Sequence, residues 1–178
     1  MMLRRLLHLV WMPVLLASPV VMAADAMTQT CLDGVSLLNP ASSYTDNGNG
    51  TVTSTVTGLT WRQCPLGQTL SSSACSGDAS YGNWETALSD AQALSFAGYS
   101  DWRLPNINEL RSLVERACTT PAINASLFPL TYSATAFWSS TSSFSDAGQV
   151  RVLDFTTGAE SLVGKSEYKV VYVVRGGN

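Results

Sequence analysis

Carboxylate side chains are the first candidates for acid–base catalysis in this sequence. The single histidine is His8, and residues 9–178 contain none, which excludes serine–histidine and cysteine–histidine pairs and histidine metal ligands there. A carboxylate pair could still hydrolyse a glycosidic bond. The candidate acids are Asp46, Asp78, Asp101, Glu109, Asp146, Asp154 and Glu160. Since none lies in a recognisable acid–base motif, we predict a protein that is not an enzyme and needs no cofactor or metal.

Structural roles account for several of these acids. Glu109 stands three residues after Asn106, which is the spacing of a reciprocal helix cap. We expect Asp101 to pair with an arginine or a backbone amide, and Asp154 to lie in a strand. Asp46 precedes Asn-Gly-Asn-Gly at 47–50, where glycine occupies positions that an EF-hand loop fills with oxygen ligands. The pattern therefore favours a hairpin turn over a calcium loop.

The four cysteines are expected to form two disulfides. No two of these cysteines have the short spacing that is typical of zinc ligands. An even number of cysteines in an exported chain indicates disulfides, and four cysteines can pair in three ways. Cys64 and Cys75 bracket a short polar loop that can be closed locally. We therefore favour the pairs Cys64–Cys75 and Cys31–Cys118.

Residues 1–23 have the pattern of a secretory signal peptide. Arg4 and Arg5 precede an apolar run over 6–21, and Ala23 provides a small residue for cleavage. The run is interrupted by prolines and is too short for a spanning helix, so we expect a periplasmic or secreted protein without stable membrane insertion. Residues 24–43 would then form a lead-in to the domain.

The charge balance disfavours a nucleic-acid ligand. The chain has 10 basic and 13 acidic residues, a net charge of −3, and losing the two arginines of the signal makes it more acidic. Like charge opposes the approach of a polyanion. The charge balance therefore disfavours polyanionic sugars as well as nucleic acid, and we expect no nucleic-acid partner.

Two helices are expected in the middle of the chain, between strands. Asn83 can cap a helix whose apolar face carries Trp84, Ala87, Leu88, Ala91 and Leu94, with Gly98 ending it. Asn106 can cap a second helix that keeps apolar spacing up to Cys118. Strands are predicted at 137–140, 150–155 and 169–175. The last of these runs is apolar at both its odd and its even positions, which indicates a strand that is covered on both faces.

Aromatic residues and one loop are the candidates for recognition. Tryptophan can stack on a sugar or anchor a peptide, but we expect Trp61, Trp84, Trp102 and Trp138 in the core. Arg103 and Arg175 are expected to pair with carboxylates. The loop at 141–149 is the predicted ligand surface because loops on a stapled scaffold often carry recognition. Its candidate ligand residues are Phe144, Ser145, Asp146 and Gln149.

Three stretches together resemble the C-terminal domain family of the Legionella collagen-like adhesin. They are residues 44–61 with the Asn-Gly hairpin, residues 98–110, and residues 137–141 with 174–177. The most specific stretch contains Asp101, Trp102, Arg103, Leu104, Pro105, Asn106 and Glu109. The likeness covers residues 44–177. It implies a C-type-lectin-like α+β fold, with two helices packed on a twisted, mostly antiparallel sheet.

The same resemblance bears on function. The architecture is shared with sulfatase-modifying enzymes, whose chemistry needs cysteines near the C-terminal end, but no cysteine follows Cys118 here. The family's adhesin binds sulfated glycosaminoglycans, which requires a basic surface. Lectin-type calcium motifs are absent. We expect an exported, non-catalytic recognition domain for a glycan or a protein at the cell envelope. The alternatives are an envelope hydrolase with a carboxylate pair and a structural accessory domain; the oligomeric state stays open.

Overall fold

The computed structural model describes residues 28–130 and 136–177. The predicted signal peptide and the first residues of the lead-in lie outside the described residues. The strands are β1 (Thr30–Cys31), β2 (Tyr44–Asp46), β3 (Thr51–Ser54), β4 (Thr60–Arg62), β5 (Thr69–Ser71), β6 (Ala74–Ser76), β7 (Tyr81–Gly82), β8 (Cys118–Thr119), β9 (Ala136–Ser142), β10 (Gln149–Asp154), β11 (Ala159–Gly164), β12 (Lys169–Val170) and β13 (Val174–Arg175). The helices are η1 (Ala41–Ser43), α1 (Trp84–Ala93) and α2 (Ile107–Ser112). None of the described helices is long and apolar enough to cross a membrane.

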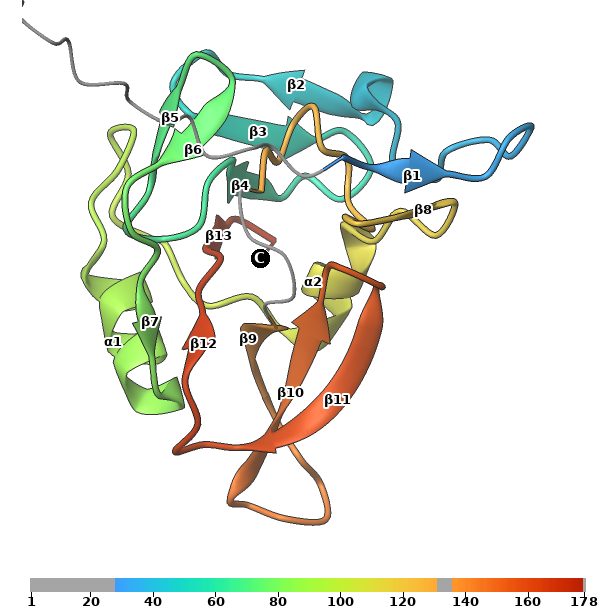
Figure 1. Ribbon diagram of the computed structural model, residues 1–178. Coiled ribbons are helices and arrows are strands. Elements are labelled where there is room, and N and C mark those ends of the chain that lie inside the picture. Colours follow the sequence, from blue (N-terminus) through green and yellow to red (C-terminus); the bar gives the residue numbers. More distant parts are fainter. Residues whose placement is uncertain (1–27, 131–135, 178) are drawn as a thin grey trace, which may run out of the picture.

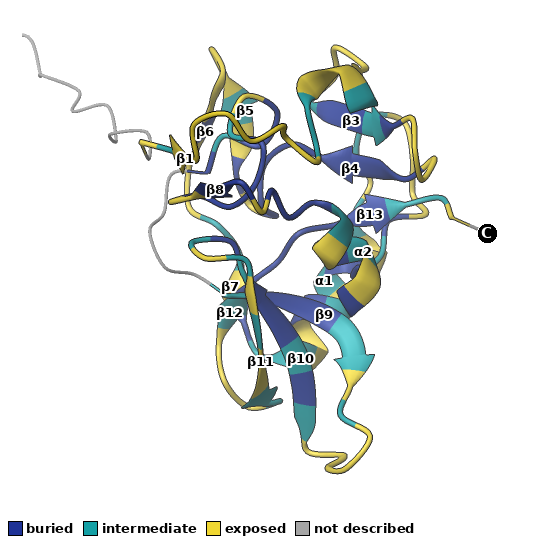
Figure 2. Ribbon diagram, turned by 90° about the vertical axis from the view of Figure 1, so that its right-hand side faces the viewer, coloured by how far each residue is buried: buried dark blue, intermediate teal, exposed yellow. Residues whose placement is uncertain are grey.

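The strands form two main sheets, which confirms the expected α+β class. One sheet has the order β11-β10-β9-β12-β7 and the other has the order β13-β4-β3-β2. All pairs in them are antiparallel except β9 with β12. Figure 1 shows the four-stranded sheet at the top, the five-stranded sheet below it, and α1 and α2 on opposite sides of the molecule. Figure 2 shows that burial is concentrated where these layers meet.

The hairpin between β2 and β3 has the turn that the Asn-Gly repeat predicts. Asp46 pairs with Val52, and the Asn47 amide donates to the Thr51 carbonyl at 3.0 Å. Gly48 and Gly50 adopt φ angles of 70° and 80°, a region that glycine enters without steric cost. The hairpin is therefore a local consequence of sequence.

Both helices begin at the expected caps and end earlier than expected. The Asn83 side chain accepts a hydrogen bond from the Thr86 amide, but α1 gives way to extended backbone at Leu94. Gly98 does not end the helix; it lies in a turn in which the backbones of Phe96 and Tyr99 bond to each other. The prediction that Gly98 is the helix end is thus wrong.

The second helix has six residues and does not reach Cys118. The Glu115 amide donates to the Ala122 carbonyl at 3.0 Å, and Val114 forms a bridge with Ile123. These contacts draw the chain out of the helix. Val114 and Ala117 are buried all the same, because the turns after α2 also direct them inward. Apolar spacing alone did not distinguish these turns from a longer helix.

The C-terminal run is buried on both sides as predicted, but it is not one strand. Residues 170–174 are all buried. Val170 lies between β9 and β7 in the five-stranded sheet, whereas Val174 pairs with Trp61 in the other sheet. The run passes from one sheet to the other and joins their cores.

The core has two clusters of buried side chains. In the first, the Tyr172 ring stacks on Phe137 with centroids 4.8 Å apart and meets Phe128 and Phe155 edge-on. The second contains Trp102 and Trp138 together with the buried alanines of α1. Both predicted disulfides, Cys31–Cys118 and Cys64–Cys75, are present. The first ties the lead-in strand β1 to β8.

Candidate functional site

The Asp-Trp-Arg-Leu-Pro segment positions other elements. Arg103 donates to both oxygens of Glu109 at 2.8 and 2.7 Å and to the Gly176 carbonyl at 2.9 Å. Arg175 makes a similar pair with Asp101 at 2.7 and 3.0 Å. These contacts confirm the expected carboxylate pairs of both arginines. They fasten the start of α2 to the C-terminal strand β13.

Glu109 also completes the predicted helix cap. Its carboxylate accepts from the Asn106 amide at 2.7 Å, while the Asn106 side chain accepts from the Glu109 amide at 3.0 Å. Burial raises the pKa of Glu109, but the bonds from Arg103 and from the Asn106 amide outweigh it and leave this pKa below its ordinary 4.5. The ionised form is therefore the one that stabilises the fold.

We expect Glu109→Ala to lower the free energy of unfolding by about 2 kcal/mol at neutral pH, because a cap and a charge-assisted pair are lost together. A carboxyl group whose pKa is lower in the folded than in the unfolded protein stabilises the fold at pH values above its unfolded-state pKa. This stabilisation is lost as the pH falls through the folded-state pKa. Urea unfolding measured from pH 7 to about 3 should therefore show that the free energies of unfolding of the wild type and the variant converge below about pH 4.5. A constant difference across this range would contradict the assigned role; Asn108→Ala, on the exposed side of α2, is the control.

The candidate catalytic acids are spread over the structure. Asp46 and Asp146 accept from the amides of Gly48 and Gly148, and Asp154 accepts from the Thr156 amide. Asp78 is exposed. Among the described residues, no three His, Cys, Asp or Glu side chains gather into a group that could hold a metal ion.

Three of the four tryptophans among the described residues lie in the core, as predicted. Trp61, Trp102 and Trp138 are at most 2% exposed. Trp84 differs: it is half-buried, its Nε1 donates to the Ser139 carbonyl at 2.8 Å, and the Lys165 ammonium lies 4.3 Å from its ring centroid. Trp84 packs against the second core cluster and also lines a pocket, because it begins α1 at the edge of the sheet.

Two exposed tyrosines also contact each other. The rings of Tyr81 in β7 and of Tyr168, just before β12, lie 6.0 Å apart, and both residues are more than half exposed. The predicted ligand loop meets the Trp84 pocket, since the Gly148 carbonyl accepts from the amide of Lys165, which lines that pocket, at 2.9 Å. Phe144 at the tip of this loop is fully exposed. A ligand role for Phe144, Ser145, Asp146 and Gln149 stays a prediction.

A cluster of arginines is the feature that the sequence did not reveal. Glu160 of β11 forms ion pairs with Arg111 of α2 and with Arg151 of β10. A pocket of about 440 Å³ opens beside this carboxylate and is also lined by Arg116. Within the described residues, the Arg116 side chain has no hydrogen bond or ion pair. Two guanidinium groups thus pair with one carboxylate, and a third lines the adjoining pocket, in a protein that is acidic overall.

The fold brings these arginines together from three elements. Arg151 pairs with Leu162 and Leu153 pairs with Glu160, so Arg151 and Glu160 are diagonal neighbours two positions apart in register and share a face of the sheet. Helix α2 packs against β10, which places Arg111 over the same strands. Gly158 lies at the base with φ of +76°, and a Cβ there would come within 2.8 Å of Val114. The pocket therefore depends on long-range packing and on one glycine.

The comparison with protein families agrees with the resemblance of the motifs. Residues 50–175 of the 178-residue chain match the model of the Lcl C-terminal domain. The matched segment includes both α-helices, the Asp101–Glu109 segment and the arginine cluster. No curated protein matches the chain.

Proposed function

Because the chain belongs to the Lcl C-terminal domain family, we propose that it is a non-catalytic, adhesin-like recognition domain that acts at the cell envelope. We further propose that its ligand is an anionic glycan, bound in the pocket of Arg111, Arg116 and Glu160. The observation that carries this proposal is the local excess of positive charge, three arginines against one carboxylate, in an otherwise acidic chain. The two disulfides support the exported setting.

The chemistry of the pocket suits sulfate or carboxylate groups. A guanidinium group offers several donors in one plane, which match the oxygens of such anions. Glu160 holds Arg111 and Arg151 in place, while Arg116 keeps all its donors available to a ligand. Val114 and Leu153 also line the pocket but are buried, so a ligand would chiefly meet the charged and polar groups.

The test is binding of heparin, a sulfated glycan, to single and double variants. Arg116→Gln removes a charge without breaking an ion pair, and Arg111→Gln leaves Glu160 paired with Arg151. We expect the double variant to bind heparin about tenfold to a hundredfold more weakly, because one or two charge-assisted bonds are lost. The affinity of the wild type should fall with added salt.

The matched control is Lys165→Gln, which also removes one positive charge. Lys165 follows the last residue of β11, whereas Glu160 lies near the start of that strand. This variant should bind heparin within about twofold of the wild type, since Lys165 lies outside the arginine pocket. Equal losses in the control and in the double variant would show a diffuse charge effect. Such a result, or tight binding by the folded double variant, would contradict the proposed site.

A further inference from the structure

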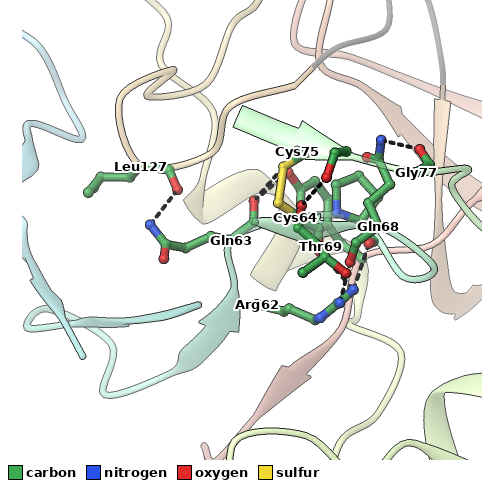
Figure 3. Close-up of a disulfide and its surroundings, with 11 residues drawn as sticks. Arg62, Gln63, Cys64, Gln68, Thr69, Cys75, Gly77 and Leu127 are labelled. Carbon is green, nitrogen blue, oxygen red and sulfur yellow. Dashed lines mark hydrogen bonds between the residues drawn. A yellow bond between two sulfur atoms is a disulfide. The ribbon is translucent and has the colours of Figure 1, made fainter. Parts of the chain in front are cut away.

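Arg62 is a buried cation that holds the cysteine-closed loop (residues 64–75). Its Nη1 donates to the Pro65 carbonyl at 2.7 Å and to the Cys64 carbonyl at 3.4 Å, and its Nη2 donates to the Gln68 carbonyl. Figure 3 shows the guanidinium group below the Cys64–Cys75 disulfide, with these carbonyls converging on it. The side chain is only 7% exposed. The loop thus encloses a positive charge.

No anion balances this charge within the described residues. None of the ion pairs there includes Arg62, and its buried Nε has no hydrogen-bond partner. The Phe96 ring lies 4.6 Å from Cζ and covers the group without supplying a charge. Burial lowers the pKa of Arg62, as expected for a cation removed from water. Carbonyl dipoles offset only part of the desolvation cost of a lone ion.

A pocket opens directly in front of Arg62. Its volume is about 320 Å³, near the lower end of the range for small-molecule sites. The pocket is lined by the tip of the β2–β3 hairpin at residues 48–50, by Thr69 and Leu70 of the cysteine-closed loop, and by Phe96. Two of the three hairpin-tip residues are glycines, which add no side chain to the lining. The pocket therefore joins an apolar ring, polar loop groups and an unneutralised guanidinium group.

We propose that this pocket binds a small carboxylate whose charge neutralises Arg62. One guanidinium group matches one negative charge, whereas sulfate or phosphate would bring a second charge that no neighbouring cation offsets. A flat carboxylate also fits against the plane of a guanidinium group. The hydrocarbon part of the ligand would contact Phe96 and Leu70. This site is separate from the arginine cluster and does not depend on the proposed glycan.

The test is a titration of the purified protein with sodium acetate, with sodium chloride at equal ionic strength as the reference. The NMR signal of the Arg62 Nε–Hε group is the readout, because Arg62 lines the pocket and this donor has no hydrogen-bond partner. We expect a saturable shift with acetate and no saturable shift with chloride or sulfate. Absence of a saturable shift with acetate in the wild type overturns the proposal without any variant.

Two variants locate the binding. Leu70→Trp fills the pocket and leaves the charge in place, and it should weaken acetate binding by about tenfold or more, the loss of one charge-assisted bond. Arg116→Gln, which we expect to weaken heparin binding, should leave acetate binding unchanged. If instead Arg116→Gln abolishes the acetate effect and folded Leu70→Trp does not, acetate binds at the arginine cluster and the proposal is wrong.

Discussion

Replacing Tyr172 with alanine is expected to lower the free energy of unfolding by about 3–5 kcal/mol, the loss typical of a large buried aromatic residue. The side chain is fully buried, and its ring contacts Phe128, Phe137 and Phe155. Tyr172 also lies in the segment that passes between the two sheets. Its truncation should therefore leave a cavity where both sheets meet. Urea unfolding followed by tryptophan fluorescence measures the change.

The control for this prediction is Tyr172→Phe, which keeps the ring. It removes only the hydroxyl, which donates to the Gln63 carbonyl at 3.3 Å. We expect a loss of about 1 kcal/mol, because one buried carbonyl loses a donor. Equal losses in the two variants would contradict a role that depends on ring packing.

Removal of the Cys31–Cys118 disulfide is the second large effect. The bond joins residues 87 positions apart, so it restricts the unfolded chain over most of the domain. Loop-closure entropy predicts a loss of about 4–5 kcal/mol in the Cys31→Ala/Cys118→Ala pair variant. Denaturant unfolding without reductant measures it. A loss below about 1 kcal/mol would show that the tether does not constrain the unfolded state as this model assumes.

The remaining disulfide gives an internal control. Cys64–Cys75 spans only 11 positions, and closing so short a loop is worth about 3 kcal/mol. Reductant should therefore destabilise the pair variant further, but by less than the first substitution did. No response to reductant in the pair variant would contradict the presence of the second bond.

Features set by short stretches of sequence were predictable. The capping box of Asn106 and Glu109 needs only their spacing, and the hairpin at 47–50 needs only residues that tolerate positive φ angles. The pairing of Cys64 with Cys75 follows from a short polar loop between them. The burial of Trp61, Trp102 and Trp138 follows from their apolar neighbours. In each case the predictive signal is local in the sequence, even where the packing that it predicts is not.

Features set by distant contacts were not predictable. The end of α2 depends on Glu115 bonding to Ala122, and the break between β12 and β13 depends on two sheets competing for one apolar run. The arginine cluster was missed because Arg111, Arg151 and Glu160 are far apart in sequence. A strand register for β10 and β11 could have placed Arg151 beside Glu160, but no local signal pointed to α2. The burial of Arg62 was also missed, because the Phe96 ring that covers it is distant in sequence.

The most direct test of the recognition function is a heparin-oligosaccharide titration followed by backbone amide NMR shifts. We predict that the largest shifts fall on the residues that line the arginine pocket, from Arg111 to Arg116 and from Thr157 to Glu160. The amides around Trp84 and Tyr168 and those of the loop with Phe144 should move little. Shifts that concentrate at that aromatic surface, or no shifts at all in the folded protein, would contradict the proposed glycan site.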